Sequence, residues 1–422
     1  MANVIKWANA LSTRASLEAA VAEVADYLEK SLPSKADLGL VFISSAYASE
    51  YPRLIPLLQE RLSLPVLIGC GGSGIIGMNT NGQAVEVEGG PALSLSLACL
   101  PDVSVHSFHI PGDALPDLDS PPDAWVDLVG ISPQEQPQFI LFSDPFSSKI
   151  SDLLQGLDYA YPGSVKVGGL TSGSSMMVKN GLFCLKDQTQ VAKSLYHEGT
   201  VGVALSGNVV LETIVAQGCR PIGQTYQVTK ADQNILLELT ALDQGKITSG
   251  EPESHPPLMV LRELIQSMDE ADRKLAQHSL FVGLARDEFK QQLGQGDFLI
   301  RNLLGVDPRI GAIAIADRIR PGQRIQFHLR DAHTSEEDLA LLLEDYQKQT
   351  NTTQAAGALI FSCLGRGEGL YGKPNFDSQL FHRYIKDIQL AGFFCNGEIG
   401  PVGSSTFLHG FTSVFGIFRA KK

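Results

Sequence analysis

The residues of this sequence best suited to chemistry lie in two glycine-rich segments near the C-terminus. The first segment contains Arg366, and the second contains Cys395, Asn396 and Glu398, with His409 a little further on. An arginine guanidinium is a permanently charged planar donor that suits a carboxylate, whereas an amide and an acid suit an ammonium group. Arg366, Asn396 and Glu398 would therefore suit a small zwitterion. A pairing of Arg366 with Glu398 across the two loops is the alternative.

Catalytic roles for Cys395 and His409 need more than the sequence supplies. A nucleophilic thiol needs a nearby base or cation that lowers its pKa. Arg366 offers a charge, but no base is identifiable beside Cys395. His409 stands between apolar residues, which is more typical of a hydrogen-bonded core histidine than of a ligand. An enzyme that uses Cys395 or Asn396, Glu398 and His409 is the alternative to a binding protein.

Two further glycine-rich segments come close to nucleotide-binding motifs. Gly69–Gly74 matches G-x-G-x-x-G, but a hairpin is expected after it, where the dinucleotide fingerprint requires a helix. Gly367–Lys373 is one residue short of a phosphate-binding loop, because Pro374 has no hydroxyl for Mg²⁺. His106 and His109 point to opposite faces of an alternating strand, which argues against joint metal ligation. The sequence therefore predicts neither a nucleotide site nor a metal site.

The elements that must position these glycine-rich segments belong to a threefold repeat in the sequence. A short apolar run ending in serine occurs three times, and each is followed by a second apolar run that breaks at glycine. The distance from serine to glycine suits a strand–helix–strand unit, whose strands are parallel and whose crossover is right-handed. We expect the serines at equivalent strand ends and the glycines at equivalent turns: Ser44 with Gly69, Ser143 with Gly168, and Ser362 with Gly392.

The intervening segments predict helices and hairpins. Apolar residues at helical spacing predict helices over residues 14–31, 51–63, 335–347 and 377–388. Alternating runs around turn residues predict hairpins at 200–213 and 225–239. The fold class is therefore α/β, with mixed sheets built from strand–helix–strand units and extended by antiparallel hairpins. A boundary near 215–225 separates two domains.

Composition limits the classes of partner. The 422 residues carry a formal net charge of −13 and 44% apolar residues, without a basic block, so nucleic acid is not an expected partner. No apolar run approaches the roughly 18 residues that span a bilayer. The six cysteines are scattered singly, and we expect them to stay reduced and unbridged. We expect a soluble, cytoplasmic protein.

Several segments resemble one known family. The C-terminal stretch 391–403, AGFFCNGEIGPVG, followed by 406–412, TFLHGFT, is similar to the signature of the FIST family. Segments 361–367, 217–223 and 167–169 resemble the same family, so that the resemblance covers nearly the whole chain. It implies a FIST-N-like domain and a FIST-C-like domain, which we expect to occupy residues 1–220 and 221–422.

The resemblance also implies a function. FIST domains are small-ligand sensory modules, found beside signalling outputs in bacteria and behind an F-box in eukaryotes. Amino acids have been proposed as ligands, and one subgroup consists of haem-based nitric-oxide sensors. The sequence begins at the FIST-N strand and ends soon after the signature. We therefore expect any output to pass through a protein partner or an assembly.

The sequence thus predicts a non-enzymatic sensory protein that binds a small molecule, with an amino acid among the candidates, and signals through a protein partner. It predicts no catalytic residue, no metal and no membrane span. The alternatives are a haem-binding gas sensor, an enzyme using Cys395 and His409, and a scaffold that recognises a protein. The predicted ligand site is where the loops after Ser362 and Phe394 meet. Its residues are Arg366, Cys395, Asn396, Glu398 and His409.

Overall fold

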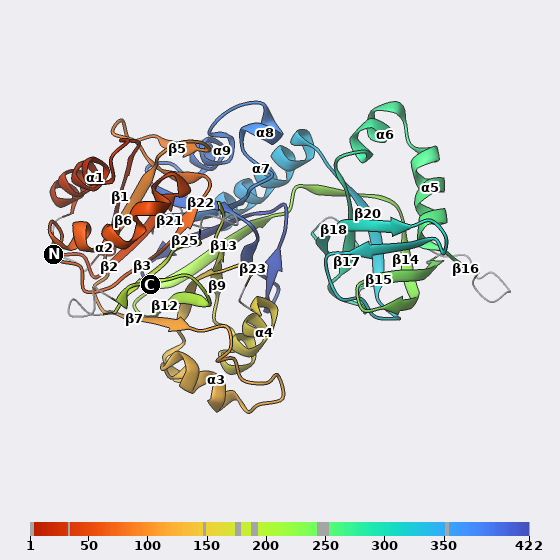
Figure 1. Ribbon diagram of the computed structural model, residues 1–422, viewed down its shortest axis with the longest axis horizontal. Coiled ribbons are helices and arrows are strands. Elements are labelled where there is room, and N and C mark those ends of the chain that lie inside the picture. Colours follow the sequence, from red (N-terminus) through yellow and green to blue (C-terminus); the bar gives the residue numbers. More distant parts are fainter. Residues whose placement is uncertain are drawn as a thin grey trace. The chain divides into compact units, whose positions relative to one another are not determined.

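The computed structural model describes residues 4–32, 34–146, 149–173, 179–186, 193–242, 253–294, 296–350 and 354–421. The chain forms two compact units, a larger one of Met1–Val215 with Ala340–Lys422 and a smaller one of Ala216–Leu339. Figure 1 labels elements of both units where there is room. No helix among the described residues has the length and apolar character needed to cross a membrane.

The three predicted strand–helix–strand units are present, and all lie in the larger unit. In each, the two strands pair in parallel, which confirms that every serine–glycine pair lies on neighbouring strands. The first repeat is β2 (Leu38–Ser44), α2 (Tyr51–Gln59) and β3 (Leu67–Gly72); the second is β8 (Gln138–Ser143), α4 (Ile150–Ala160) and β9 (Lys166–Leu170); the third is β21 (Ala355–Cys363), α9 (Phe376–Tyr384) and β22 (Gln389–Cys395).

The repeated glycines lie inside strands and not at turns, so this part of the prediction was wrong. A Cβ at Gly69, Gly168 or Gly392 would lie 1.9, 1.8 and 1.8 Å from a carbonyl oxygen of the neighbouring parallel strand. Glycine is needed there because the two backbones approach too closely for any side chain. Aligned on these glycines, Ser143 and Ser362 are equivalent, whereas Ser44 lies one residue further along its strand.

Each sheet of the larger unit is completed by a hairpin from another repeat. The hairpin β4 (Ile75–Met78) and β5 (Ala84–Val87) follows the first repeat but pairs with β22 of the third. The hairpin β10 (Leu182–Leu185) and β11 (Leu195–Tyr196) follows the second repeat and pairs with β3 of the first. The hairpin β23 (Glu398–Val402) and β24 (Ser405–His409) follows the third repeat and pairs with β9 of the second. The three repeats are therefore interlocked in a cycle.

The strand orders of the three sheets match one another. They are β1-β6-β2-β3-β10-β11, β7-β12-β8-β9-β23-β24 and β13-β25-β21-β22-β4-β5. The strands not yet given are β1 (Lys6–Ser12), β6 (Leu93–Cys99), β7 (Val103–Ile110), β12 (Thr200–Gly207), β13 (Val210–Ala216) and β25 (Ser413–Arg419). Strands β12 and β13 belong to different sheets, so the hairpin predicted at 200–213 was wrong. The chain crosses between sheets after Gly207, which has a φ of +95°.

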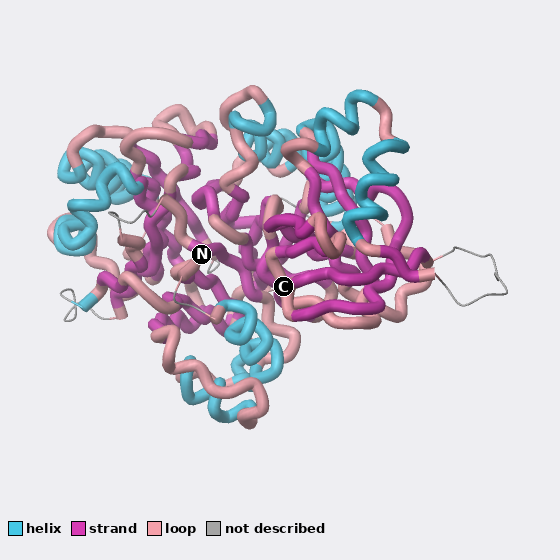
Figure 2. Tube along the Cα trace, turned by 45° about the vertical axis from the view of Figure 1, so that its right-hand side comes forward, coloured by secondary structure: helices cyan, strands magenta, loops and turns pink. Residues whose placement is uncertain are grey.

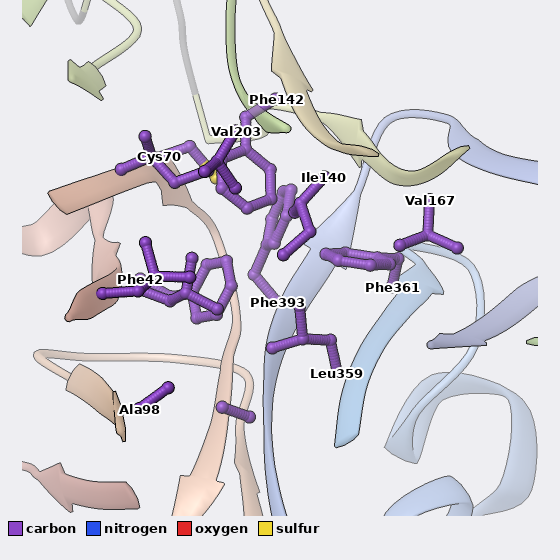
Figure 3. Close-up of a cluster of buried hydrophobic side chains, with 14 of the residues drawn as sticks. Phe42, Cys70, Ala98, Ile140, Phe142, Val167, Val203, Leu359, Phe361 and Phe393 are labelled. Atoms are coloured by element: carbon purple, nitrogen blue, oxygen red, sulfur yellow. The ribbon is translucent and has the colours of Figure 1, made fainter. Parts of the chain in front are cut away.

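A shared apolar core joins the inner faces of the three sheets. Phe42, Phe142 and Phe361 occupy equivalent positions, each directly after the residue opposite a repeated glycine. The ring of Phe393 lies 5.5 to 6.0 Å from these three rings, and Figure 3 shows it between Phe42 and Phe361. Aromatic rings at these separations add to the stabilisation from burial alone.

Helices cover the outer faces of these sheets, as Figure 2 shows. Residues next to the core phenylalanines point outward, so that Val41 packs with α1 and α2, and Leu141 packs with α3 and α4. On the third sheet, Phe381 of α9 stacks on Phe415 at 5.0 Å. The helices not yet given are α1 (Leu17–Ser31), α3 (Pro122–Val129), α7 (Ala332–Gln349) and α8 (Glu368–Tyr371), with short 3-10 helices η1 (Ser45–Glu50) and η2 (Pro133–Glu135).

The smaller unit is an antiparallel sheet with its own core. Strands β14 and β15 pair as the hairpin predicted at 225–239, and the sheet closes on itself because β14 also pairs with β20. The core comes from the strands and from α5. The elements are β14 (Cys219–Asp232), β15 (Ile235–Ala241), β16 (Ser254–His255), α5 (Pro257–Ser267), α6 (Glu270–Ala276), β17 (Leu280–Ala285), β18 (Phe298–Asp307), β19 (Ala312–Ile315) and β20 (Arg324–Arg330).

These compact units divide the chain differently from the predicted domains 1–220 and 221–422. The difference arises because the third repeat returns to the first two and supplies one of the three interlocked sheets. The predicted α/β class with mixed sheets and two-domain organisation is confirmed.

The repeated glycines give a direct test of the close approach between parallel strands. We expect Gly168→Ala and Gly392→Ala to lower the free energy of unfolding by about 3 kcal/mol or more, because the added methyl group would displace a backbone carbonyl. Gly369→Ala is the control, since a Cβ at that position meets nothing within 4 Å. Urea unfolding of the three variants measures the effect. Equal stability of Gly392→Ala and Gly369→Ala would contradict the packing described.

Candidate functional site

Arg366 is held in a buried ion pair. Its side chain is fully buried, with Nε 2.6 Å and Nη2 3.0 Å from the two carboxylate oxygens of Asp377, at the start of α9. Nη2 also lies 2.5 Å from the hydroxyl of Tyr371, which donates to Asp377 at 2.9 Å. This bidentate pairing raises the pKa of Arg366 despite its burial. Arg366 is therefore committed to the protein's own carboxylate, and a pairing with Glu398 was the wrong alternative.

A second buried carboxylate, Glu86, approaches this pair from the first-repeat hairpin. Its Oε1 accepts the backbone N–H of Ser378 at 2.8 Å, and Oε2 has no hydrogen-bond partner among the described residues. The backbone N–H of Glu86 donates to Oδ1 of Asn375 at 2.6 Å. Burial, and then the nearby Asp377, raises the pKa of Glu86 to about 7. Glu86 is thus an acid without a counterion of its own, because Arg366 already neutralises Asp377.

An open cleft of about 860 Å³ lies between the same two elements, the β4–β5 hairpin and α9 with the loop after it. Gln83 lines it from the hairpin, and Gln379 and Arg383 line it from α9. Lys386 and Asp387 line it from the loop. Asn375, which binds the backbone of Glu86, also lines the cleft. The buried charges and the cleft therefore share one junction between the first and third repeats.

The two cations of this cleft, Arg383 and Lys386, are exposed. Within the described parts of the chain, no carboxylate lies within ion-pair distance of Arg383 or Lys386. The neighbouring His382 places Nε2 2.9 Å from the carbonyl oxygen of Ile388, and burial lowers its pKa. Its charge therefore adds little at neutral pH. Among the residues that the structure describes, this cleft therefore carries two cations without an ion-pair partner, beside the single carboxylate of Asp387.

The other predicted site residues lie in the second glycine-rich segment and its hairpin. The two loops do meet, because the backbone N–H of Leu364 donates to the carbonyl of Cys395 at 3.0 Å. Asn396 is exposed, and its Nδ2 donates to the carbonyl of Thr171 at 2.8 Å. Glu398 is buried and accepts the backbone N–H of Thr412 at 3.2 Å. The side chain of Arg366 turns away from these groups toward Asp377, so the predicted trio does not converge on one ligand.

Cys395 and His409 are in places that disfavour chemistry. Cys395 belongs to the shared core, and burial raises the pKa of its thiol well above the usual value, which disfavours a thiolate. His409 is buried, and its Nε2 lies 3.0 Å from the carbonyl oxygen of Gly400, so this nitrogen carries the proton. No disulfide bond joins any of the six cysteines, all of which lie in the described part of the chain.

The same residues do not fit haem. An axial ligand must offer a thiolate or an imidazole nitrogen with a free lone pair toward an open pocket. Cys395 is enclosed by the core, and Nε2 of His409 is engaged by Gly400. The described residues also contain no group of three or more His, Cys, Asp or Glu side chains placed to hold a metal ion.

Sequence reasoning missed the cleft and most of the buried cluster. The helix predicted over 377–388 begins at Asp377, but no role in a site was predicted for its carboxylate or for that of Glu86. Nothing local in the sequence connects Glu86 with Asp377, because the hairpin crosses to the sheet of another repeat. The motif Arg383-Tyr-Ile-Lys386-Asp387 was a usable signal, since it places two cations at the end of a helix.

Comparisons with known proteins place the chain in a family. Residues 37–241 match the FIST N domain, and residues 257–401 match the FIST C domain. The chain belongs to the FIST family. FIST domains are sensory domains for small ligands, so the resemblance seen in the sequence is confirmed at the level of the family.

Relatives of this FIST protein extend over its whole length. An uncharacterized protein of Mycobacterium tuberculosis is 32% identical over 409 residues, covering 97% of this chain and 98% of the relative. An uncharacterized protein of Mycobacterium bovis is 31% identical, covering 96% and 95%. An F-box/LRR-repeat protein of Arabidopsis thaliana is 29% identical over 23% of this chain and 21% of its own. A cyanuric acid hydrolase structure from A. caulinodans covers 99% of both chains at 9% identity, with a TM-score of 0.31.

The buried Glu86 makes a prediction for pH dependence in this FIST protein. Its pKa rises from 4.5 to about 7 on folding, so the native state holds a proton that the unfolded chain has lost. Its contribution to stability is therefore complete below about pH 4.5 and is lost as pH rises through about 7. We expect the free energy of unfolding to fall between about pH 4.5 and pH 7, by as much as about 3 kcal/mol from this group.

Glu86→Gln isolates this contribution, because the amide cannot ionise. Urea unfolding at several pH values should give a flatter pH profile for Glu86→Gln than for the unmodified chain. Glu29→Gln, at an exposed position of α1, is the matched control and should keep the original profile. Parallel profiles for Glu86→Gln and the unmodified chain would contradict the raised pKa.

Proposed function

We propose that the chain is a non-enzymatic sensory protein that binds a small ligand in the cleft between the β4–β5 hairpin and α9. The observation that carries this proposal is an open cleft of about 860 Å³ with two cations on its wall, neither of which forms an ion pair within the described parts of the chain. A concave site with a few convergent polar groups is the usual form of a small-molecule site. FIST domains are small-ligand sensory domains, which supports the same function.

The walls of the cleft supply a route from binding to signalling. One wall is the hairpin of the first repeat and the other is α9 of the third, and they are joined by the contacts of Glu86 with Asn375 and Ser378. A ligand that contacts both walls would stabilise their junction. A protein partner would then distinguish the bound state from the free state by a change in the stability or position of α9.

The five residues predicted from the sequence take supporting roles in this proposal. Arg366 is a positioning residue, because it holds Asp377 at the start of α9 and so fixes the wall of the cleft. The strands of the third repeat and its hairpin, which pairs with the second repeat, are stabilised by Cys395, Glu398 and His409. Asn396 fixes the junction between β22 and the second repeat through its bonds to Leu170 and Thr171.

The haem-sensor and enzyme alternatives receive no support from these positions. Both depend on Cys395 and His409, whose reactive atoms are enclosed or engaged. The amino-acid ligand inferred from the trio of Arg366, Asn396 and Glu398 loses its carboxylate partner, because Arg366 is paired with Asp377. The proposed site is therefore the cleft and not the junction of the two loops.

Native mass spectrometry tests the proposal on full-length protein purified from its own host. We expect a small-molecule adduct that is lost in Gln379→Trp, because the indole would fill the cleft from the exposed face of α9. Glu336→Trp, at an exposed position of α7, is the control for the added indole and should keep the adduct. Full retention of the adduct in Gln379→Trp would place the ligand elsewhere, and protein without any adduct would also count against the proposal.

A further inference from the structure

We infer that the ligand of this cleft is a small organic dianion, bound by Arg383 and Lys386 acting together. This inference rests on the proposed function and adds the chemical class of the ligand. It comes from the two cations of the cleft, which form no ion pair among the described residues, and from the hydrogen-bonding groups around them.

The two cations are the cleft's dominant polar feature. Arg383 lies in the last turn of α9, and Lys386 lies in the loop just after it, so both approach the cleft from the same end of one helix. Both are exposed and neither has an ion-pair partner among the described residues. An arginine offers a planar fork to a carboxylate or phosphate, and a lysine offers a mobile point charge. Each of the two cations can take one acid group, so a ligand with two negative charges would engage both of them.

The remaining lining groups set the size and polarity of that ligand. Gln83 and Gln379 supply amides from opposite walls, which can donate to acid oxygens or accept from a hydroxyl. Asp387 is the one lining residue with a carboxylate, and it leaves the lining with a net positive charge. The cleft volume of about 860 Å³ falls in the range of small-molecule sites.

The buried carboxylates behind the cleft do not oppose an anion. Asp377 is neutralised by the bidentate pair with Arg366. Glu86 has a pKa raised to about 7, so it is partly protonated at neutral pH, and the nearby Glu88 accepts the backbone N–H of Glu368 at 2.7 Å. The pKa of Glu88 is also raised, first by burial. The local field is therefore less negative than the number of acids suggests.

A series of probes of equal length tests the charge requirement. Succinate carries two charges, succinamate carries one and succinamide carries none, and calorimetric titration of the full chain measures the affinity for each. We expect the affinity to fall by about tenfold with each lost charge, and the affinity for succinate to fall as salt is added. Inorganic phosphate is the second dianion, and it distinguishes a requirement for two separated acid groups from a requirement for charge alone.

Variants of the two cations test the location. Arg383→Gln and Lys386→Gln should each weaken the binding of succinate by about tenfold, and the double variant should bind succinate no better than succinamide. Arg262→Gln, at an exposed position of α5, is the matched control and should leave the affinity unchanged. Circular dichroism spectra of the variants should match that of the unmodified chain, because both side chains are exposed.

The outcomes separate this inference from the proposed function. Equal affinity for succinate and succinamide, or unchanged succinate affinity in the double variant, would overturn the dianion. If neither succinate nor phosphate bound, while Gln379→Trp still removed the adduct, the dianion would also be overturned. The cleft would then remain the ligand site. If every cleft variant kept the adduct, the proposed function itself would be overturned.

Discussion

The exchange of hairpins between repeats is the constraint on which the rest of the structure depends. Each parallel pair of strands presents an open edge, and an open edge carries unpaired backbone groups that must be satisfied. In every sheet of the larger unit, this edge is covered by a hairpin from another repeat. No repeat can therefore complete its sheet alone. Gly69, Gly168 and Gly392 allow the parallel strands to approach closely, and the aromatic rings around Phe393 fill the space that the three sheets enclose.

The same exchange creates the cleft and the charges behind it. The hairpin of the first repeat brings Glu86 against α9 of the third, where Arg366 and Asp377 already form a buried pair. Breaking one partner of such a pair is costly, because a charge is left in a low-dielectric interior. Since the cleft lies between the same two elements, whatever stabilises or loosens their junction also acts on the proposed ligand site. In the proposed function, ligand binding and fold stability would therefore be coupled through the contacts of Glu86 with Asn375 and Ser378.

The sequence predicted the local units well and their assembly poorly. Strand–helix–strand spacing identified the three repeats, because helix length and strand pairing are local properties of the chain. It could not predict that β12 and β13 separate into different sheets, or that Glu86 meets Asp377, because both follow from pairing between distant segments. Arg366 was predicted to bind a ligand, with a pairing to Glu398 as the alternative, whereas the structure pairs it with Asp377. Family resemblance supplied the sensory function, whereas the cationic cleft emerged only when the hairpin and α9 were placed together.

Because β4 of the first-repeat hairpin pairs with β22 of the third repeat, we expect these two segments to open as one unit. Residue-resolved amide hydrogen exchange under native conditions tests it most directly, because it reports the free energy with which each segment opens. We predict that protected amides of Ile75–Met78 exchange with the same free energy as those of Gln389–Cys395, the strand with which this hairpin pairs. A hairpin that opens alone, at a markedly lower free energy than β22, would contradict the interlocked fold and the coupling drawn from it.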